Sequence, residues 1–260
     1  MLKRLLSVVG TYKLYEKWLW YQIKNGEKPE HIGIILDGNR RWASDKTMAP
    51  WFGHEKGAEK IEQLLDWCLK FEVKSITLYA FSTENFKRSK DEIAEIMRIA
   101  VAEFRKILTD ERIHQNKVHV KVIGRTSLLP EELQKTIEDA EKATEAYDEH
   151  FLNIALAYGG RAEIVDAAKK IAEVVHKGEL DPQKIDEGTF EQYLYTSHLP
   201  KQDPDLIIRT SGEERLSGFL LWQSAYSELF FLDVYWPDFR VIDLLRAIRT
   251  FQKRKRRFGA

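Results

Sequence analysis

Six residues with the chemistry of a metal and phosphate site follow an apolar run near the start of the chain. The run is HIGIIL at 31–36, and the residues after it are Asp37-Gly38-Asn39-Arg40-Arg41-Trp42. A carboxylate is an oxygen ligand of the kind that Mg²⁺ prefers, and arginines donate paired hydrogen bonds to phosphate oxygens. Gly38 allows a ligand to approach the backbone. The alternative is an aspartate helix cap beside solvated arginines, but the six together favour a site where a metal ion and a polyanion meet.

Two later segments carry polar groups that could complete such a site. His54, in GHEKG, is expected at a helix start, where it could donate to a phosphate, although a lone histidine more often has a structural role. The segment FSTENFKRS at 81–89 brings hydroxyl, amide, carboxylate and basic groups together after a second apolar run. Ser89 and Glu92 can form the capping box of the next helix. The candidates in this segment are Ser82, Thr83, Glu84, Asn85, Phe86 and Arg88.

A third segment, IIRTSGEERLSGFLLWQSAYSELFF, contains a second set of anion donors. Arg209, Arg215 and Ser217 surround Gly212, which predicts a second phosphate site. Glu228 follows in a mostly apolar setting, where a carboxylate is costly unless it is paired or bound to a metal. A core salt bridge and a metal ligand are about equally good explanations of Glu228.

The elements that must position these residues alternate along the chain. Four helical patterns lie between short apolar runs, which is typical of a parallel sheet with helices on its faces. Ligands of such sheets bind at the carboxyl ends of the strands, where the candidate residues lie. The expected strands are 31–37, 75–81, 118–124, 151–158, 205–211 and 229–235, and the expected helices are 55–71, 90–109, 130–147 and 160–177.

Composition limits the classes of function. The 260 residues, 43% of them hydrophobic, are enough for one large α/β domain, and 41 basic against 41 acidic residues give no argument for a nucleic-acid partner. The basic run KRKRRF at 253–258 is explained more simply as a solvated helix end. The one cysteine, Cys68, excludes an internal disulfide and is expected in the core.

The N-terminal segment is a basic amphipathic pattern. Residues 2–24 place Leu5, Val8 and Leu19 at helical spacing among lysines and arginines, so we expect a helix that packs on its own domain or, as the alternative, rests on a membrane surface. No stretch reaches the roughly 20 apolar residues of a membrane span. The expected location is cytoplasmic, with peripheral membrane contact as the alternative.

Missing motifs narrow the chemistry further. The chain has no P-loop signature, no GxGxxG, no adjacent aspartates, no CxxC and no HExxH. Two anion sites, a carboxylate for a hard metal and many large apolar residues remain to be explained. A substrate with a diphosphate head and a hydrocarbon tail would use all of them.

The motifs HIGIILDGNRRWA, GHEKG, ITLYAFSTENFKR, NIALAYGGRAEIVDA, DLIIRTSGEERLSGFLLWQSAYSELFF, WPDF and RRFG together resemble the cis-prenyltransferases. The resemblance extends from His31 to Gly259. It implies one α/β catalytic domain over 29–260, after an N-terminal helix within 1–28, with a six-stranded, mostly parallel sheet and an apolar tunnel. Tunnel-lining candidates are Leu78, Ala80, Leu152 and Ile154.

The resemblance also implies residue roles and partners. Asp37 matches the residue that engages Mg²⁺ and the leaving diphosphate, and Asn85 matches a residue proposed to abstract a proton. Glu228 matches a second Mg²⁺-linked carboxylate, and Arg257 an element that reaches across a homodimer. The allylic diphosphate would contact Gly38, Asn39, Arg40, Arg41, Trp42 and His54, the reacting ends would lie under Ser82, Thr83, Glu84, Asn85, Phe86 and Arg88, and isopentenyl diphosphate would contact Arg209, Arg215 and Ser217.

Four positions depart from the usual bacterial pattern. Arg40, Pro50, Phe86 and Glu214 stand where many bacterial members carry a small residue, an arginine, a tryptophan and a histidine. The paired arginines are more like archaeal and eukaryotic members, so we expect an archaeal-type enzyme that extends a farnesyl or geranylgeranyl primer to a medium- or long-chain polyprenyl diphosphate, the precursor of a glycosyl carrier lipid. The alternative is a non-catalytic subunit of a heteromeric enzyme; such subunits lack the strand-end aspartate and much of the arginine set.

Overall fold

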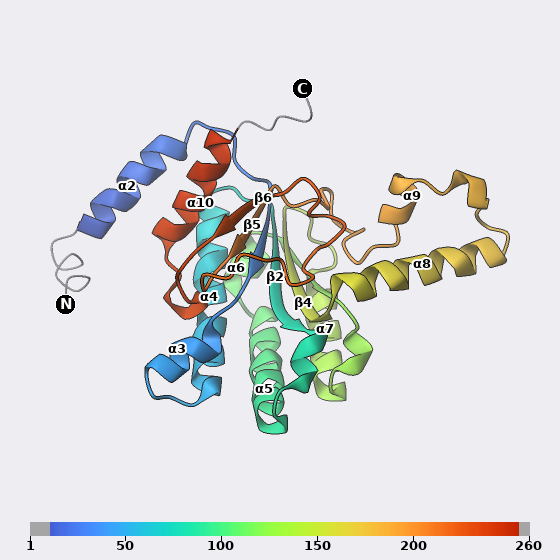
Figure 1. Cartoon of the computed structure of the whole chain (residues 1–260), viewed down its shortest axis with the longest axis horizontal. Coiled ribbons are helices and arrows are strands. Elements are labelled where there is room, and N and C mark those ends of the chain that lie inside the picture. Colours follow the sequence, from blue (N-terminus) through green and yellow to red (C-terminus); the bar gives the residue numbers. More distant parts are fainter. Residues whose placement is uncertain (1–10, 255–260) are drawn as a thin grey trace.

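The six apolar runs form the six strands of one sheet in the computed structural model, which describes residues 11–254 (Figure 1). Every pair of neighbouring strands is parallel, and the spatial order is β3-β4-β2-β1-β5-β6. The expected α/β fold with a six-stranded sheet is therefore confirmed. The strands are β1 (His31–Ile35), β2 (Ser75–Ser82), β3 (Val118–Ile123), β4 (His150–Tyr158), β5 (Leu206–Arg209) and β6 (Glu228–Phe231).

The four helices expected between strands are present within a few residues of their predicted bounds. The largest difference is at the first of them, which begins at Pro50, five residues earlier than expected, because proline suits the first turn of a helix. The helices are α2 (Thr11–Ile23), α3 (Asn39–Asp45), α4 (Pro50–Lys70), α5 (Lys90–Ile107), α6 (Glu111–Gln115), α7 (Glu131–Thr144), α8 (Gly160–His176), α9 (Glu187–Glu191) and α10 (Val241–Lys253). Short 3₁₀ turns lie at Thr83–Lys87, Thr126–Leu128, Pro182–Lys184 and Trp236–Asp238.

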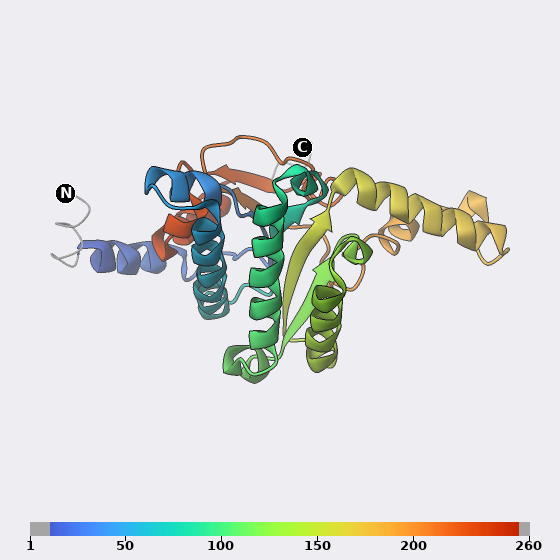
Figure 2. The same ribbon diagram turned by 90° about the horizontal axis from the view of Figure 1, so that it is seen from below.

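The two faces of the sheet pack against different partners. Alternate strand residues point to opposite faces, so Ile32 and Ile34 of β1 join the larger core with α4, α5, α7 and α10, whereas Ile35 joins a smaller cluster with Tyr79 and Phe219. Figure 2 shows α4, α5 and α7 side by side along one side of the sheet. Strands buried on both faces explain why the sequence showed apolar runs rather than strict alternation.

The helix α2 packs on α10, and its Leu19 and Ile23 are buried there (Figure 1). This is the packing expected of residues 2–24; the part of that prediction before Thr11, with Leu5 and Val8, lies outside the described residues. Cys68 is buried in the core, as expected. Between Thr11 and Arg254, none of the helices combines the length and the apolar character that crossing a membrane requires.

Candidate active site

The candidate residues meet at one edge of the sheet because the strands that precede them are neighbours. Ile35, at the end of β1, is in register with Tyr79 of β2 and with Arg209, the last residue of β5. Asp37 follows β1 by two residues, and Ser82 ends β2. A cavity of about 920 Å³ opens at this edge. Its polar lining includes Asp37, Asn39, Arg40, Arg41, Ser44, His54, Ser82, Glu84, Asn85, Arg88, Arg209 and Ser217.

The turn that carries Asp37 depends on a glycine. Gly38 has φ +101°, and a Cβ there would lie 2.7 Å from the Tyr235 ring and 3.0 Å from Ser211 Cβ. The Asp37 backbone N–H donates to Thr210 Oγ1 at 3.0 Å, which ties the turn to the end of β5. The chain after β1 is therefore held in one conformation, with the Asp37 carboxylate at the cavity.

Asp37 is surrounded by cationic groups. Arg209 Nη2 donates to Asp37 Oδ2 at 2.9 Å, and Arg41 Nη2 donates to Asp37 Oδ1 at 3.3 Å. Burial alone would raise the pKa of Asp37, but hydrogen bonds from Arg209 and Ser211 and the charge of Arg41 outweigh it and lower the pKa below its ordinary value. Asp37 is thus an ionised carboxylate at neutral pH, as a Mg²⁺ ligand must be.

Arg209 is the buried centre of the predicted second phosphate site. Its side chain is 6% exposed, and its Nη1 donates to Ser217 Oγ at 2.8 Å and to the Arg215 carbonyl. The Arg215 side chain is 64% exposed, pairs with Glu213 and does not line the cavity. The structure therefore brings Arg209 and Ser217 to Asp37 and leaves Arg215 at the rim.

A second basic group is centred on Glu92, a residue that the sequence analysis assigned only to a capping box. Ser89 does cap α5 through the Glu92 N–H, but the Glu92 carboxylate, 7% exposed, has other partners. Its Oε1 accepts from His54 Nε2 at 3.1 Å and from Arg88 Nη1 at 3.0 Å, and lies 3.6 Å from Arg40 Nε. The signal in the sequence was the spacing of four residues between Arg88 and Glu92, which places both on one face of the α5 start.

The expectation that His54 begins a helix is wrong. His54 is the fifth residue of α4, so it contributes its side chain and not a free terminal N–H. Gly53 is the residue that requires no side chain, because a Cβ there would lie 2.0 Å from the Asn39 carbonyl oxygen. Burial lowers the pKa of His54, and its hydrogen bond to Glu92 opposes this only in part, so the ring is neutral at pH 7.

The segment after β2 places only some of its candidates on the cavity. Ser82, Glu84, Asn85 and Arg88 line it, and Asn85 Oδ1 accepts from the Ser82 N–H at 3.0 Å, which orients the Asn85 amide. Phe86 instead packs edge-on against Phe81, with ring centroids 5.0 Å apart. Thr83 Oγ1 donates to Glu84 at 3.3 Å and is not part of the lining.

Three other candidates lie away from the cavity or outside the described residues. Trp42 is buried, with Lys46 Nζ 3.4 Å from its ring centroid. Glu228 pairs in register with Leu206, at the opposite edge of the sheet from Arg209, and forms an ion pair with Arg254. Within residues 11–254 of this one chain, Glu228 is thus separated from Asp37, because the last strand begins at Glu228 rather than ending there. Arg257 lies outside the described residues.

An apolar cavity of about 160 Å³ adjoins the main one between the sheet, α4 and α5. Leu36, Asn39, His54, Ala80 and Phe81 line both. Of the four tunnel candidates, Ala80, Leu152 and Ile154 line this second cavity, whereas Leu78 is fully buried and does not. The site therefore joins a polar chamber to an apolar one.

The chamber is lined by two carboxylates, Asp37 and Glu84, of which Asp37 is bonded to arginines. No group of three or more His, Cys, Asp or Glu side chains suited to a metal ion occurs between Thr11 and Arg254. Mg²⁺ is commonly held by one or two carboxylates together with substrate phosphates and water. The ionised Asp37 carboxylate beside Arg41 and Arg209 fits that pattern.

Comparison with known proteins gives consistent matches. A family model described as undecaprenyl diphosphate synthase matches residues 35–259. A Methanopyrus kandleri protein named tritrans,polycis-undecaprenyl-diphosphate synthase (geranylgeranyl-diphosphate specific) is 56% identical over 254 residues, which cover 98% of this chain and 93% of that protein. A Pyrococcus horikoshii protein of the same name is 53% identical, over 96% of this chain and 94% of that protein.

A solved structure agrees with these matches in fold and in sequence. The crystal structure of lavandulyl diphosphate synthase from Lavandula x intermedia, in complex with dimethylallyl diphosphate, superposes with a TM-score of 0.86 at 39% identity. The superposition covers 90% of this chain and 99% of that chain.

Proposed function

The chain belongs to the undecaprenyl diphosphate synthase family of cis-prenyltransferases, and we propose that it condenses isopentenyl diphosphate repeatedly onto an allylic diphosphate primer. The observation that carries the proposal is the pair of basic groups on one cavity. In one group, Asp37 is hydrogen-bonded to Arg41 and Arg209. In the other, Glu92 is hydrogen-bonded to Arg88 and His54 and forms an ion pair with Arg40. Two separate anion-binding groups suit the joining of two diphosphates better than the hydrolysis of one.

The reaction begins with breakage of the bond between the allylic carbon and its diphosphate. The bonding electrons leave with the diphosphate, and preorganised arginines stabilise the charge that develops on it. Mg²⁺, held by Asp37 together with substrate oxygens, would supply Lewis-acid stabilisation of the same diphosphate. Arg40, Arg41 and Arg88 all line the chamber, as this role requires.

The second diphosphate is assigned to Arg209 and Ser217, whereas Arg41, the other arginine bonded to Asp37, is assigned to the allylic diphosphate. Arg209 and Ser217 would bind isopentenyl diphosphate and place its double bond next to the allylic cation. The double bond attacks the cation, one proton leaves the new adduct, and the product remains allylic for the next cycle. Asn85, whose amide is oriented by the Ser82 N–H, is our candidate for the group that receives or relays this proton.

The primer and the tail are assigned from the relatives and the second cavity. The Methanopyrus and Pyrococcus proteins are named as geranylgeranyl-diphosphate specific, so we propose geranylgeranyl diphosphate as the preferred primer. The growing hydrocarbon would enter the apolar cavity beyond Ala80 and Phe81. We further propose a medium- to long-chain product of the undecaprenyl type, the precursor of a glycosyl carrier lipid.

Membrane contact and assembly are further parts of the proposal. Leu14, Trp18 and Tyr21 are exposed on α2 next to Lys13 and Lys17, a pattern suited to the surface of an anionic membrane from the cytoplasmic side. Binding of the purified protein to anionic vesicles, and its loss on Trp18→Ala, would test this contact. A homodimer is the assembly implied by the family, and light scattering of the full chain would test it.

The decisive test of the proposed reaction uses the purified full chain with Mg²⁺ and labelled isopentenyl diphosphate. Geranyl, farnesyl and geranylgeranyl diphosphates are compared as primers. We expect label in a long-chain product, with the highest rate from geranylgeranyl diphosphate, and chromatography gives the chain length. If none of the three primers leads to incorporation of labelled isopentenyl diphosphate, the proposed function is wrong.

A further inference from the structure

The apolar cavity next to the site has an unusual end. Near the chamber it is lined by uncharged side chains and His54, but its distant end is lined by Glu62, Glu103, Lys106, Asp110 and Arg112. These five side chains come from α4, from the end of α5 and from the α5–α6 connection with the start of α6. We call them the ionic network.

The ionic network lies at the opposite end of α5 from the active site. Glu92 and Lys106 are 14 residues apart on α5, which corresponds to about 21 Å along a helix. Figure 2 shows the blue α3 near one end of the green α5 and the short α6 at its other end. A tail that grows from the chamber between α4 and α5 therefore meets the ionic network last.

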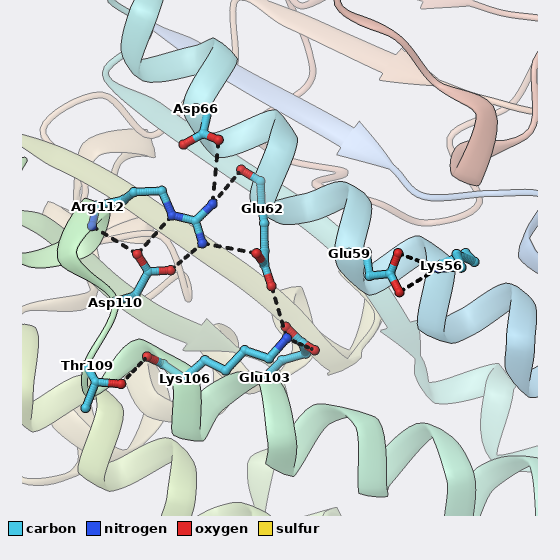
Figure 3. Close-up of polar contacts among 9 residues, drawn as sticks. All are labelled: Lys56, Glu59, Glu62, Asp66, Glu103, Lys106, Thr109, Asp110 and Arg112. Carbon is cyan, nitrogen blue, oxygen red and sulfur yellow. Dashed lines mark hydrogen bonds and ion pairs between the residues drawn. The ribbon is translucent and has the colours of Figure 1, made fainter.

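The members of the ionic network bond to one another (Figure 3). Arg112 Nη2 donates to Glu62 Oε2 at 3.2 Å, and Arg112 Nε donates to Asp110 Oδ1 at 2.9 Å. Lys106 Nζ donates to Glu62 Oε1 at 3.0 Å and to Glu103 Oε1 at 2.8 Å. Glu62 thus joins both cations, and α4 is tied to α5 and α6 across the end of the cavity.

Simple attachment of α4 to α5 does not explain why charges line a cavity. A second ion-pair set, in which Arg98 joins Glu55 of α4 to Glu95 of α5, attaches the same two helices without lining either cavity. Apart from Asp110, the charged groups of the ionic network are about one third to one half exposed and hold water. A hydrocarbon end that reached them would have to remove that water or separate the pairs, and desolvation of a charge is costly. The apolar lining ends where this cost begins.

We propose that the ionic network is the stop that sets the maximal length of the product. The inference rests on the proposed function and concerns the same substrate tail. Each cycle adds one isoprene unit at the chamber and moves the far end of the tail toward Glu62 and Arg112. When the tail reaches the paired charges, further addition requires their separation, and release of the product becomes faster than the next condensation.

The test compares product lengths from Arg112→Ala, Lys106→Ala and the matched control Arg98→Ala. Each variant removes one cation that joins α4 to α5 or α6, but only the first two open the end of the cavity. With geranylgeranyl diphosphate as primer, we expect the main product of Arg112→Ala and Lys106→Ala to lengthen by at least one isoprene unit. Arg98→Ala should give the product distribution of the unmodified protein.

Each outcome of this test decides for or against the ionic network as the stop. Lys106 is about half exposed, so its variant folds even if Arg112→Ala does not. Unchanged lengths in the network variants would overturn the inference while leaving the proposed function intact, as would equal lengthening in Arg98→Ala. Absence of any product from the unmodified protein would instead overturn the proposed function, and this inference with it.

Discussion

Replacement of Glu92 by glutamine should weaken the fold far more than a typical charge removal on α5. The Glu92 side chain is 7% exposed, and its Oε1 holds His54 and Arg88 and lies near Arg40. Removing one partner of a buried ion pair costs about 3 to 5 kcal/mol. Glutamine retains an acceptor, and Arg40 is 58% exposed and therefore screened. We expect the free energy of unfolding to fall by about 2 to 3 kcal/mol.

The assay is urea unfolding at pH 7 with the slope checked for two-state behaviour. Glu95→Gln is the matched control, because Glu95 lies on the same helix and pairs with Arg98 at the surface. Its loss should be below about 1 kcal/mol. Equal losses in the two variants would refute the reasoning that the Glu92 carboxylate is the buried centre of a basic group.

Two further predictions concern the stability of the fold. Burial lowers the pKa values of His31 and His198 to about 4. Between pH 6.5 and pH 4 the unfolded chain therefore binds more protons than the folded chain, so the free energy of unfolding should fall as the pH drops from 6.5 toward 4. The lowered pKa of His31 corresponds to about 3 kcal/mol of stability lost over this pH range. In urea unfolding, the free energy of unfolding of His31→Gln should depend less on pH than that of the unmodified chain, whereas the control His176→Gln, at an exposed position, should behave like the unmodified chain. Gly53→Ala should cost about 1 to 3 kcal/mol, because its Cβ would meet the Asn39 carbonyl, whereas Gly188→Ala, whose Cβ would have Asp186 Oδ1 in ordinary contact at 3.7 Å, should not destabilise in a thermal scan.

Most of the architecture could be predicted because apolar runs and helical periodicity are local signals. The six strands and the four long helices between them follow from such patterns. The grouping of Asp37, Ser82 and Arg209 also follows, since parallel strands end at one edge. Strand order depends on long-range packing and could not be predicted from local patterns. The expected strand 229–235 already placed Glu228 at the start of a strand, so its assignment to the site at the strand ends disagreed with the predicted elements.

The role of Glu92 and the position of His54 were mispredicted for a different reason. Glu92 fits a capping box equally well whether its carboxylate turns back to the helix start or reaches across to His54, which is distant in sequence. His54 was misplaced because Gly53 and Gly57 looked like the surroundings of a helix start. In the structure both glycines are inside α4, where a Cβ would collide with Asn39.

The charged end of the apolar cavity illustrates the same limit. Glu62, Lys106 and Arg112 each have the sequence context of a solvated helix face, and their ion pairs join segments 44 and 50 residues apart. Only the packing of α4 against α5 brings these side chains to one end of a cavity. Sequence patterns identify residues that can do chemistry, but the distances among segments decide which of them act together.

The most direct measurement of the central claim is a single-turnover reaction of preformed enzyme and geranylgeranyl diphosphate with labelled isopentenyl diphosphate. We compare the unmodified chain with Asp37→Ala, which removes the carboxylate between Arg41 and Arg209. The unmodified chain should form one new carbon–carbon bond per site in the presence of Mg²⁺, and the variant should lose at least about 10²-fold in rate while remaining folded, as judged by circular dichroism, at the assay temperature. Undiminished condensation by a folded Asp37→Ala protein would contradict the account.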